Sequence, residues 1–146
     1  MLFLVRCQER RIKIVSTVAT MIMVLLIVYI TVLDRSRQTV SEIDLVPFSF
    51  IFRGIRIRTV FREYWMNVYL FIPFGLESSA IMKKRHWRIV LIGFAFSIVI
   101  ESIQYIYSLG FCETDDVIAN TLGCLIGVYL HKVSMRFKSM DKQKTD

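Results

Sequence analysis

Histidine and cysteine are scarce in this chain, which has two histidines and three cysteines among 146 residues. The unequal spacing of Cys7, Cys112 and Cys124 matches no metal-binding or redox motif, so we interpret them as unpaired small hydrophobic residues. His86 and His131 stand at the ends of apolar runs, away from the acidic residues of the chain. The histidines and cysteines therefore predict no metal site, no cofactor and no histidine-centred catalytic arrangement.

The share of polar residues expected of a soluble domain is also missing. Hydrophobic residues make up 55% of the chain and gather in runs. Several runs approach the length of about 20 residues that crosses a bilayer core of about 30 Å. Nucleic-acid-binding motifs are absent, and the net charge of +7 comes from Lys and Arg placed beside the apolar runs. These features predict a multi-pass membrane protein whose direct partner is the lipid bilayer, with no nucleic acid.

The apolar runs predict one all-α domain, a bundle of four transmembrane helices. The first run ends at Leu33 without the small residues of a cleavage site, so we interpret it as a retained helix rather than a signal peptide. The predicted helices span residues 14–33, 64–82, 89–109 and 117–131. A basic tail at residues 136–146 follows them and is predicted to be disordered.

Residues 34–63 form the longest polar connection. Pro47 favours extended backbone at the residue before it. Between Phe48 and Phe61 both a strand period and a helical spacing fit. Aromatic residues mixed with arginines suit a segment lying in the headgroup region, and a solvated loop is the other interpretation.

The distribution of basic residues predicts the orientation. Alternating helices put the N-terminal head, the loop at 83–88 and the tail on one side, and these segments carry most of the Lys and Arg. The turn at 111–116 carries none. The positive-inside rule therefore predicts cytoplasmic termini and an outer acidic turn in the plasma membrane, although the arginines of residues 35–62 count against it.

Polar residues inside the apolar runs form a candidate pocket. Glu101 and Gln104 are spaced i, i+3, and Asp116 and Asn120 are spaced i, i+4, so each pair shares a helix face. An antiparallel hairpin of the third and fourth helices would bring the faces together, with Asn67 from the second helix. Ionisable groups at membrane depth are costly, which favours a function for Glu101 and Asp116. For the amides, an interhelical hydrogen-bond network explains the pattern equally well.

Small residues and proline mark helix contacts. Pro73, followed by Gly75, predicts a kink or a break in the second helix. Gly123 and Gly127 form a G-x-x-x-G pair, which permits close helix packing. In the acidic turn, Glu113 and Asp115 are interpreted as solvated acids.

Three segments together resemble the VanZ-like family: Asn67-x-x-x-Phe71-Ile72-Pro73-Phe74-Gly75, Glu101-x-x-Gln104 and Asp116-x-x-x-Asn120-Thr121-x-Gly123. The resemblance implies a small bacterial integral membrane protein of Gram-positive cells, since the founding member is associated with resistance to the glycopeptide antibiotic teicoplanin. Many relatives resemble "G-R" where this chain has Gly110-Phe111. If the arginine of those relatives pairs with an acid elsewhere in the protein, this chain has lost that pair.

Three functions fit these residues. A non-catalytic binding protein could contact a lipoglycopeptide antibiotic or a lipid-linked cell-wall precursor through the polar pocket, and we favour this role in teicoplanin resistance or a related envelope function. A membrane enzyme could use Glu101 as general acid or base beside an ionised Asp116. A divalent cation could bind at Glu113, Asp115 and Asp116, although their spacing matches no known cation loop.

Overall fold

The structure is a computed structural model that describes residues 2–36, 43–48, 57–82, 85–110 and 112–145. As predicted, it is built from four α-helices: α1 (Leu2–Val28), α2 (Ile57–Ile81), α3 (His86–Ile106) and α4 (Thr114–Thr145). A short π-helix, η1 (Tyr29–Leu33), continues α1. The connections also contain two strands that the sequence did not predict, β1 (Ile43–Asp44) and β2 (Cys112–Glu113).

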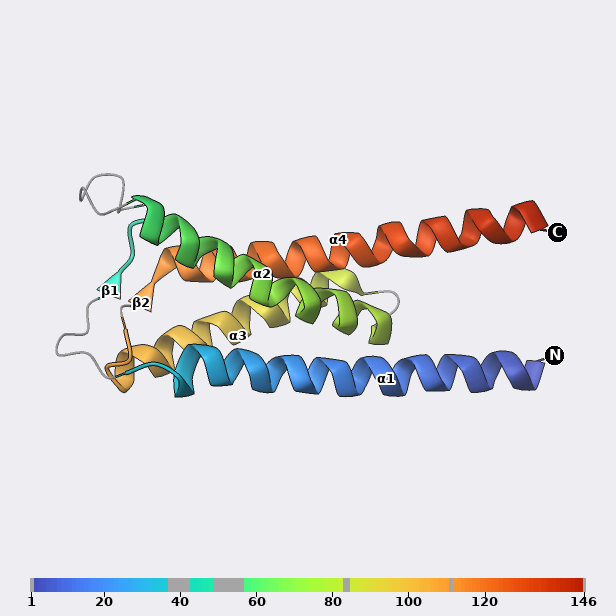
Figure 1. Ribbon diagram of the computed structural model, residues 1–146, viewed down its shortest axis with the longest axis horizontal. Coiled ribbons are helices and arrows are strands. Elements are labelled where there is room, and N and C mark those ends of the chain that lie inside the picture. The colour runs from blue at the N-terminus through green and yellow to red at the C-terminus, as the bar shows by residue number, and fades with distance from the viewer. Residues whose placement is uncertain (1, 37–42, 49–56, 83–84, 111, 146) are drawn as a thin grey trace.

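The helices lie along one long axis, and both chain termini are at the same end of the molecule (Figure 1). We call this the terminal end. The strands β1 and β2 lie at the opposite end, together with the start of α4 (Figure 1). We call this the strand end. The acidic turn therefore belongs to the strand end, and the side of the membrane that each end faces stays a prediction.

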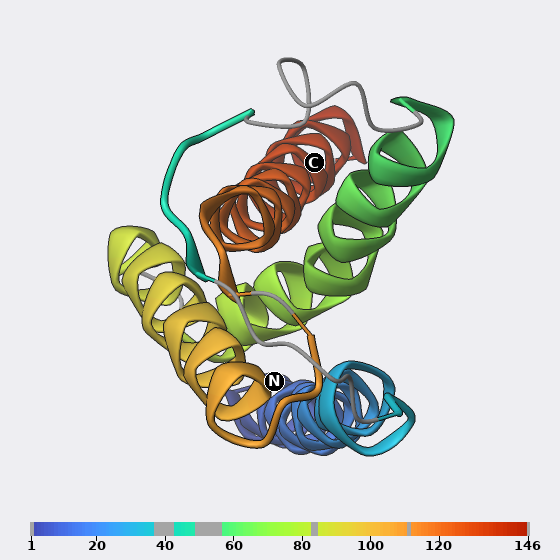
Figure 2. The ribbon, with the colours of Figure 1, turned by 90° about the vertical axis from the view of Figure 1, so that its left-hand side faces the viewer.

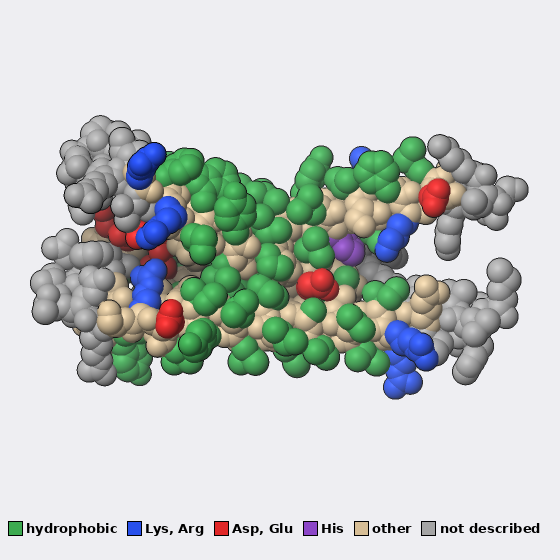
Figure 3. All heavy atoms as spheres, in the orientation of Figure 1, with side chains coloured by type: hydrophobic (Ala, Val, Ile, Leu, Met, Phe, Trp, Pro, Cys, Tyr) green, Lys and Arg blue, Asp and Glu red, His purple; other side chains and the backbone are tan. Residues whose placement is uncertain are grey.

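Three helical stretches are long and apolar enough to cross a membrane: Arg10–Leu33, His86–Ile106 and Thr114–Asp141. Along the first of them Val15, Met21 and Leu25 are exposed, and Figure 3 shows apolar side chains over much of the visible surface. Such a surface suits lipid rather than water. The class of membrane protein is thus supported, whereas α2, which the sequence predicted as a further span, is not one of these stretches.

The backbones of α2 and α4 approach closely where glycines replace side chains. A Cβ built on Gly123 would overlap the carbonyl oxygen of Val68, and one on Gly127 would overlap that of Ile72. On the other helix, a Cβ on Gly75 would overlap the carbonyl of Cys124. The G-x-x-x-G pair therefore packs against α2, the second helix of the chain.

Helix α2 continues through Pro73 as one element from Ile57 to Ile81. Proline removes one backbone hydrogen bond and clashes with the preceding turn, which bends a helix. Figure 2 shows α2 curving along its length. Of the two predicted alternatives at Pro73, the helix is bent and not broken.

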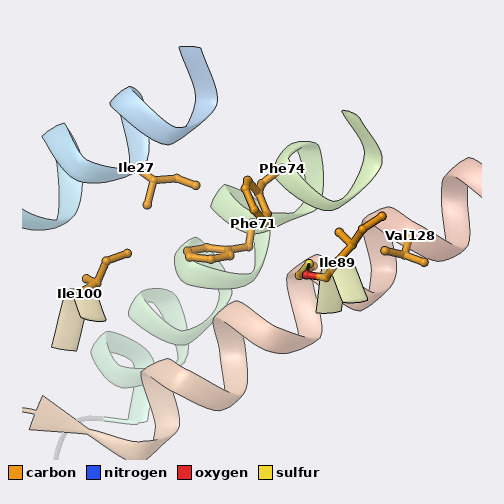
Figure 4. Packing of buried hydrophobic residues seen from close by; sticks show 7 residues of the cluster. Ile27, Phe71, Phe74, Ile89, Ile100 and Val128 are labelled. Carbon is orange, nitrogen blue, oxygen red and sulfur yellow. Dashed lines mark hydrogen bonds between the residues drawn. The ribbon is translucent and has the colours of Figure 1, made fainter. Parts of the chain in front are cut away.

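A buried apolar cluster joins all four helices (Figure 4). It includes Ile27 of α1, Phe71 of α2, Ile100 of α3 and Val128 of α4. Cys124 belongs to the same cluster, is fully buried and has a free thiol, as expected for a small hydrophobic residue. This core lies between the two ends of the bundle, and the polar residues near the strand end meet beyond it.

Both terminal helices are longer than their apolar runs. α1 begins at Leu2 and α4 continues to Thr145, whereas the sequence pattern places their limits near residues 14 and 131 and expects disorder from residue 136. Residues 2–13 and 128–145 contain no glycine or proline. Basic and other straight-chain residues are good helix formers, so the helices extend beyond the apolar runs. Within the connection at 34–63, residues 37–42 and 49–56 lie outside the described residues. The prediction of an interfacial segment falls largely on them and stays a prediction.

Candidate functional site

The strand end is assembled by a segment from the long connection that docks on the acidic turn. β1 pairs with β2 in parallel, Ile43 opposite Cys112 and Asp44 opposite Glu113. The hydroxyl of Thr114 donates to the carbonyl oxygen of Asp44 at 3.2 Å. These contacts join residues about seventy positions apart. The segment at residues 43–48 therefore covers the acidic turn, which the sequence pattern did not predict.

Asp115 holds the same segment in place. Its two carboxylate oxygens accept the backbone N–H of Phe48 at 2.9 and 3.1 Å. Phe48 has φ of 59°, a left-handed conformation that is uncommon for a bulky residue and that this bond helps to hold. Asp115 is only 8% exposed, so its interpretation as a solvated turn acid is wrong. The carboxylate is buried because it lies in the first turn of α4 and contacts the docked segment at Phe48. The helix dipole favours a negative charge at this position.

The centre of the site is a pair of carboxylates from different helices. Glu101 of α3 is 2% exposed and accepts the backbone N–H of Glu113 at 3.2 Å. Asp116 of α4 lies close enough for its charge to act on Glu101 and is hydrogen-bonded to the side chain of Asn67. Three of the predicted pocket residues, from α2, α3 and α4, therefore meet at the strand end.

Arg35, which the sequence analysis did not assign to the site, approaches this acid pair. A Cβ built on Gly110 would lie 2.7 Å from Nη1 of Arg35, so the guanidinium passes directly over the glycine. Its charge acts on both Glu101 and Asp116. The chain has Phe111 where many relatives resemble an arginine, but Arg35 supplies a guanidinium near the acids from another segment. Its sequence signal was only its place just after the first apolar run.

Gln104 and Asn120 form separate interhelical bonds. Nε2 of Gln104 donates to the carbonyl oxygen of Thr31 at 2.8 Å, near the end of η1, where helical carbonyls lack a partner of their own. Nδ2 of Asn120 donates to Oγ of Ser97 at 2.8 Å. Both amides are buried, and their oxygens have no hydrogen-bond partner in the part of the chain that the structure describes. Their amide nitrogens thus connect helices rather than join the acid pair.

Burial and neighbouring charges shape the chemistry of the turn. Burial raises the pKa of Glu113 to about 7, and the charges of Asp116 and Asp115 act in the same direction. Burial, reinforced by the charge of Glu101, also raises the pKa of the Cys112 thiol. A thiol is nucleophilic as its thiolate, so Cys112 is a poor nucleophile in this setting.

The raised pKa of Glu113 predicts a pH dependence of stability. Its usual pKa is 4.5 and its folded value is about 7, so between these values the folded protein binds more protons than the unfolded chain. The free energy of unfolding should therefore fall as pH rises from about 4.5 to about 7, and then level off. Glu113→Gln should flatten this part of the profile, measured as thermal unfolding of the detergent-solubilised protein across pH. An unchanged slope in the variant would contradict the assignment.

The structure does not bring the other chemical candidates to this site. Over the described ranges, no group of three or more His, Cys, Asp or Glu side chains has the arrangement to hold a metal ion. His86 and His131 lie side by side with ring centroids 6.1 Å apart. Figure 3 shows histidine at a distance from the cluster of acidic side chains at the strand end, although single acidic side chains also lie further along the bundle.

The fold and the acid pair define a multi-pass helical membrane protein with buried carboxylates at the strand end, on which the charge of Arg35 acts. The VanZ/LLP1 family model matches residues 14–135, so the chain belongs to this family, as the three sequence segments indicated. It is 39% identical over 90 residues to Protein VanZ of Enterococcus faecium, a match that covers 59% of this chain and 53% of that protein. The chain thus spans about half the length of this relative. No solved structure matches.

Proposed function

We propose that this protein acts in the envelope of a Gram-positive cell as a non-catalytic binding protein that contributes to teicoplanin resistance. Its ligand would be the lipoglycopeptide itself or a lipid-linked cell-wall precursor, bound at the strand end facing outward across the plasma membrane. Membership of the VanZ/LLP1 family supports the general role. The observation that carries the site is the meeting of Glu101, Asp116 and Arg35 beneath the docked segment.

Carboxylates beside a guanidinium suit a ligand with both amine and acid groups. Glu101 and Asp116 can accept hydrogen bonds from amines or amides, and Arg35 can donate to a carboxylate or phosphate. Such groups occur in peptide antibiotics and in peptide-bearing wall precursors. Lipid beside the apolar faces of α1 and α3 would hold an acyl chain of the same molecule, which favours acylated over non-acylated drugs.

A binding role fits the side chains better than catalysis. Covalent catalysis needs a nucleophile within reach of a base. Cys112, the thiol beside the acids, has a raised pKa, and the histidine pair lies away from them. The alternative, an enzyme acting on a lipid-linked precursor with Glu101 as general acid or base, is favoured by one observation: Glu101 is almost fully buried.

The test is drug susceptibility of a sensitive Gram-positive host that expresses this protein. We expect protection against teicoplanin and little against vancomycin, which lacks the acyl chain. Asp116→Ala and Glu101→Ala should return susceptibility to that of the host without the protein, because each removes half of the acid pair. Glu77→Gln, a carboxylate of α2 away from the cluster, is the matched control and should protect fully.

All variants are compared at equal abundance in the membrane. If Asp116→Ala and Glu101→Ala insert and protect as well as the parent, the acid pair is not the site. The precursor pool separates the two functions, since an enzyme changes its chemical composition with turnover. A binding protein leaves the composition unchanged.

A further inference from the structure

A hollow at the other end of the bundle has no part in the proposed function. It has a volume of about 630 Å³ and lies between the start of α3 and the last part of α4. His86 lines it from α3, and His131, Lys132 and Arg136 line it from α4. Figure 3 shows the molecule hollowed toward the terminal end, with a histidine in the hollow and a basic side chain beside it.

The polar groups of this hollow suit an anion. Lys132 and Arg136 are spaced i, i+4, so both cationic groups project from one face of α4. Nδ1 of His86 is buried and has no hydrogen-bond partner in the residues that the structure covers. As an N–H donor it would be satisfied by an anionic oxygen. Glu77 carries an opposing charge that acts on His131, and the two cations lining the hollow outnumber it.

The position of the hollow indicates which anion is available there. The membrane-length stretch of α3 begins at His86. The stretch Thr114–Asp141 of α4 has no Lys or Arg before Lys132, so its basic part begins there. The hollow is therefore at the level where apolar spans meet the headgroups. Tyr129, which also lines it, is 64% exposed and has the amphipathic ring typical of this level.

We propose that this hollow binds the phosphate headgroup of an anionic phospholipid. The phosphate oxygens lie between Arg136 and Lys132 and accept a hydrogen bond from His86. The acyl chains leave past Tyr129 along the apolar surface of α4. Basic pockets beside transmembrane helices bind acidic lipid headgroups in this way, and basic residues just outside a span attract anionic lipid.

Lipid binding is measured on the purified full chain in nanodiscs. One set contains phosphatidylcholine alone and the other includes phosphatidylglycerol, and lipid retained by the protein is quantified by native mass spectrometry. We expect preferential retention of phosphatidylglycerol. The double variant Lys132→Gln, Arg136→Gln should lower this preference about tenfold, because two charges beside the phosphate are lost. Both side chains are exposed, so the variant should fold.

The matched control is Arg11→Gln with Lys13→Gln, which removes two exposed basic charges from α1 and should retain the preference. His86→Phe should lower retention, and His86→Asn, whose amide can reach a similar position to Nδ1, should restore part of it. Equal loss in the α1 control, or no preference for phosphatidylglycerol in the parent, would overturn the proposal. Inorganic phosphate that competes away the lipid at equal concentration would show a soluble anion as the ligand and would also overturn it.

Discussion

Gly123→Ile is expected to prevent this protein from assembling a stable bundle. The added Cβ would overlap the carbonyl oxygen of Val68 and lie 3.0 Å from Cβ of Phe71. Backbone cannot rotate away as a side chain can, so α2 and α4 would have to separate. Overpacking usually costs about 1–3 kcal/mol and occasionally more, and a collision with backbone belongs at the upper limit or above it.

The measurement is the yield of monodisperse protein in detergent and its thermal unfolding midpoint. Leu125→Ile, at a half-exposed position two residues further along α4, introduces the same side chain without a collision and should behave as the parent. Gly123→Ala should fall between the two, because its Cβ meets the same carbonyl with less bulk behind it. If Gly123→Ile matches Leu125→Ile, the close crossing of α2 and α4 does not exist as described.

Arg35→Leu is expected to lower both stability and protection against teicoplanin. The substitution would leave Glu101 and Asp116 facing each other without the guanidinium that now acts on both. Removing one partner of a fully buried charge pair costs about 3–5 kcal/mol, and half-burial of Arg35 should reduce the cost to about 1–3 kcal/mol. Protection should fall as far as in Asp116→Ala if the three charges act as one site.

Arg35→Lys keeps the charge but loses the planar fork of donors, so it should restore stability more fully than protection. Arg62→Leu, an exposed arginine of α2, controls for the loss of a positive charge. Unfolding midpoints and drug susceptibility are compared for all four proteins. Full protection in Arg35→Leu would show that the guanidinium is not part of the binding site.

The local features of the helices followed from residue spacing. Apolar runs predicted four helices because burial of the backbone in lipid permits few alternatives to a helix. The periodicity of 3.6 residues placed Glu101 and Gln104 on one face and Asp116 and Asn120 on another. Gln104, Asp116 and Asn120 have partners on neighbouring helices, and Glu101 accepts the backbone N–H of Glu113 in the turn. Helix limits were less accurate, because good helix formers continue α1 and α4 beyond the apolar runs.

Which faces meet was decided only by the tertiary structure. Spacing alone could not show that Gly123 lies against Val68, that Asp115 accepts the N–H of Phe48, or that Arg35 passes over Gly110. Each contact joins segments far apart in the chain, and its energy depends on the shape and charge of both partners. By itself the sequence determined the class of membrane protein, its helices and the presence of costly carboxylates in them. Only the packing of the helices decided which hydrogen-bond donors and cations lie beside those carboxylates. The same local sequence pattern is compatible with any arrangement of the helices that stabilises the carboxylates.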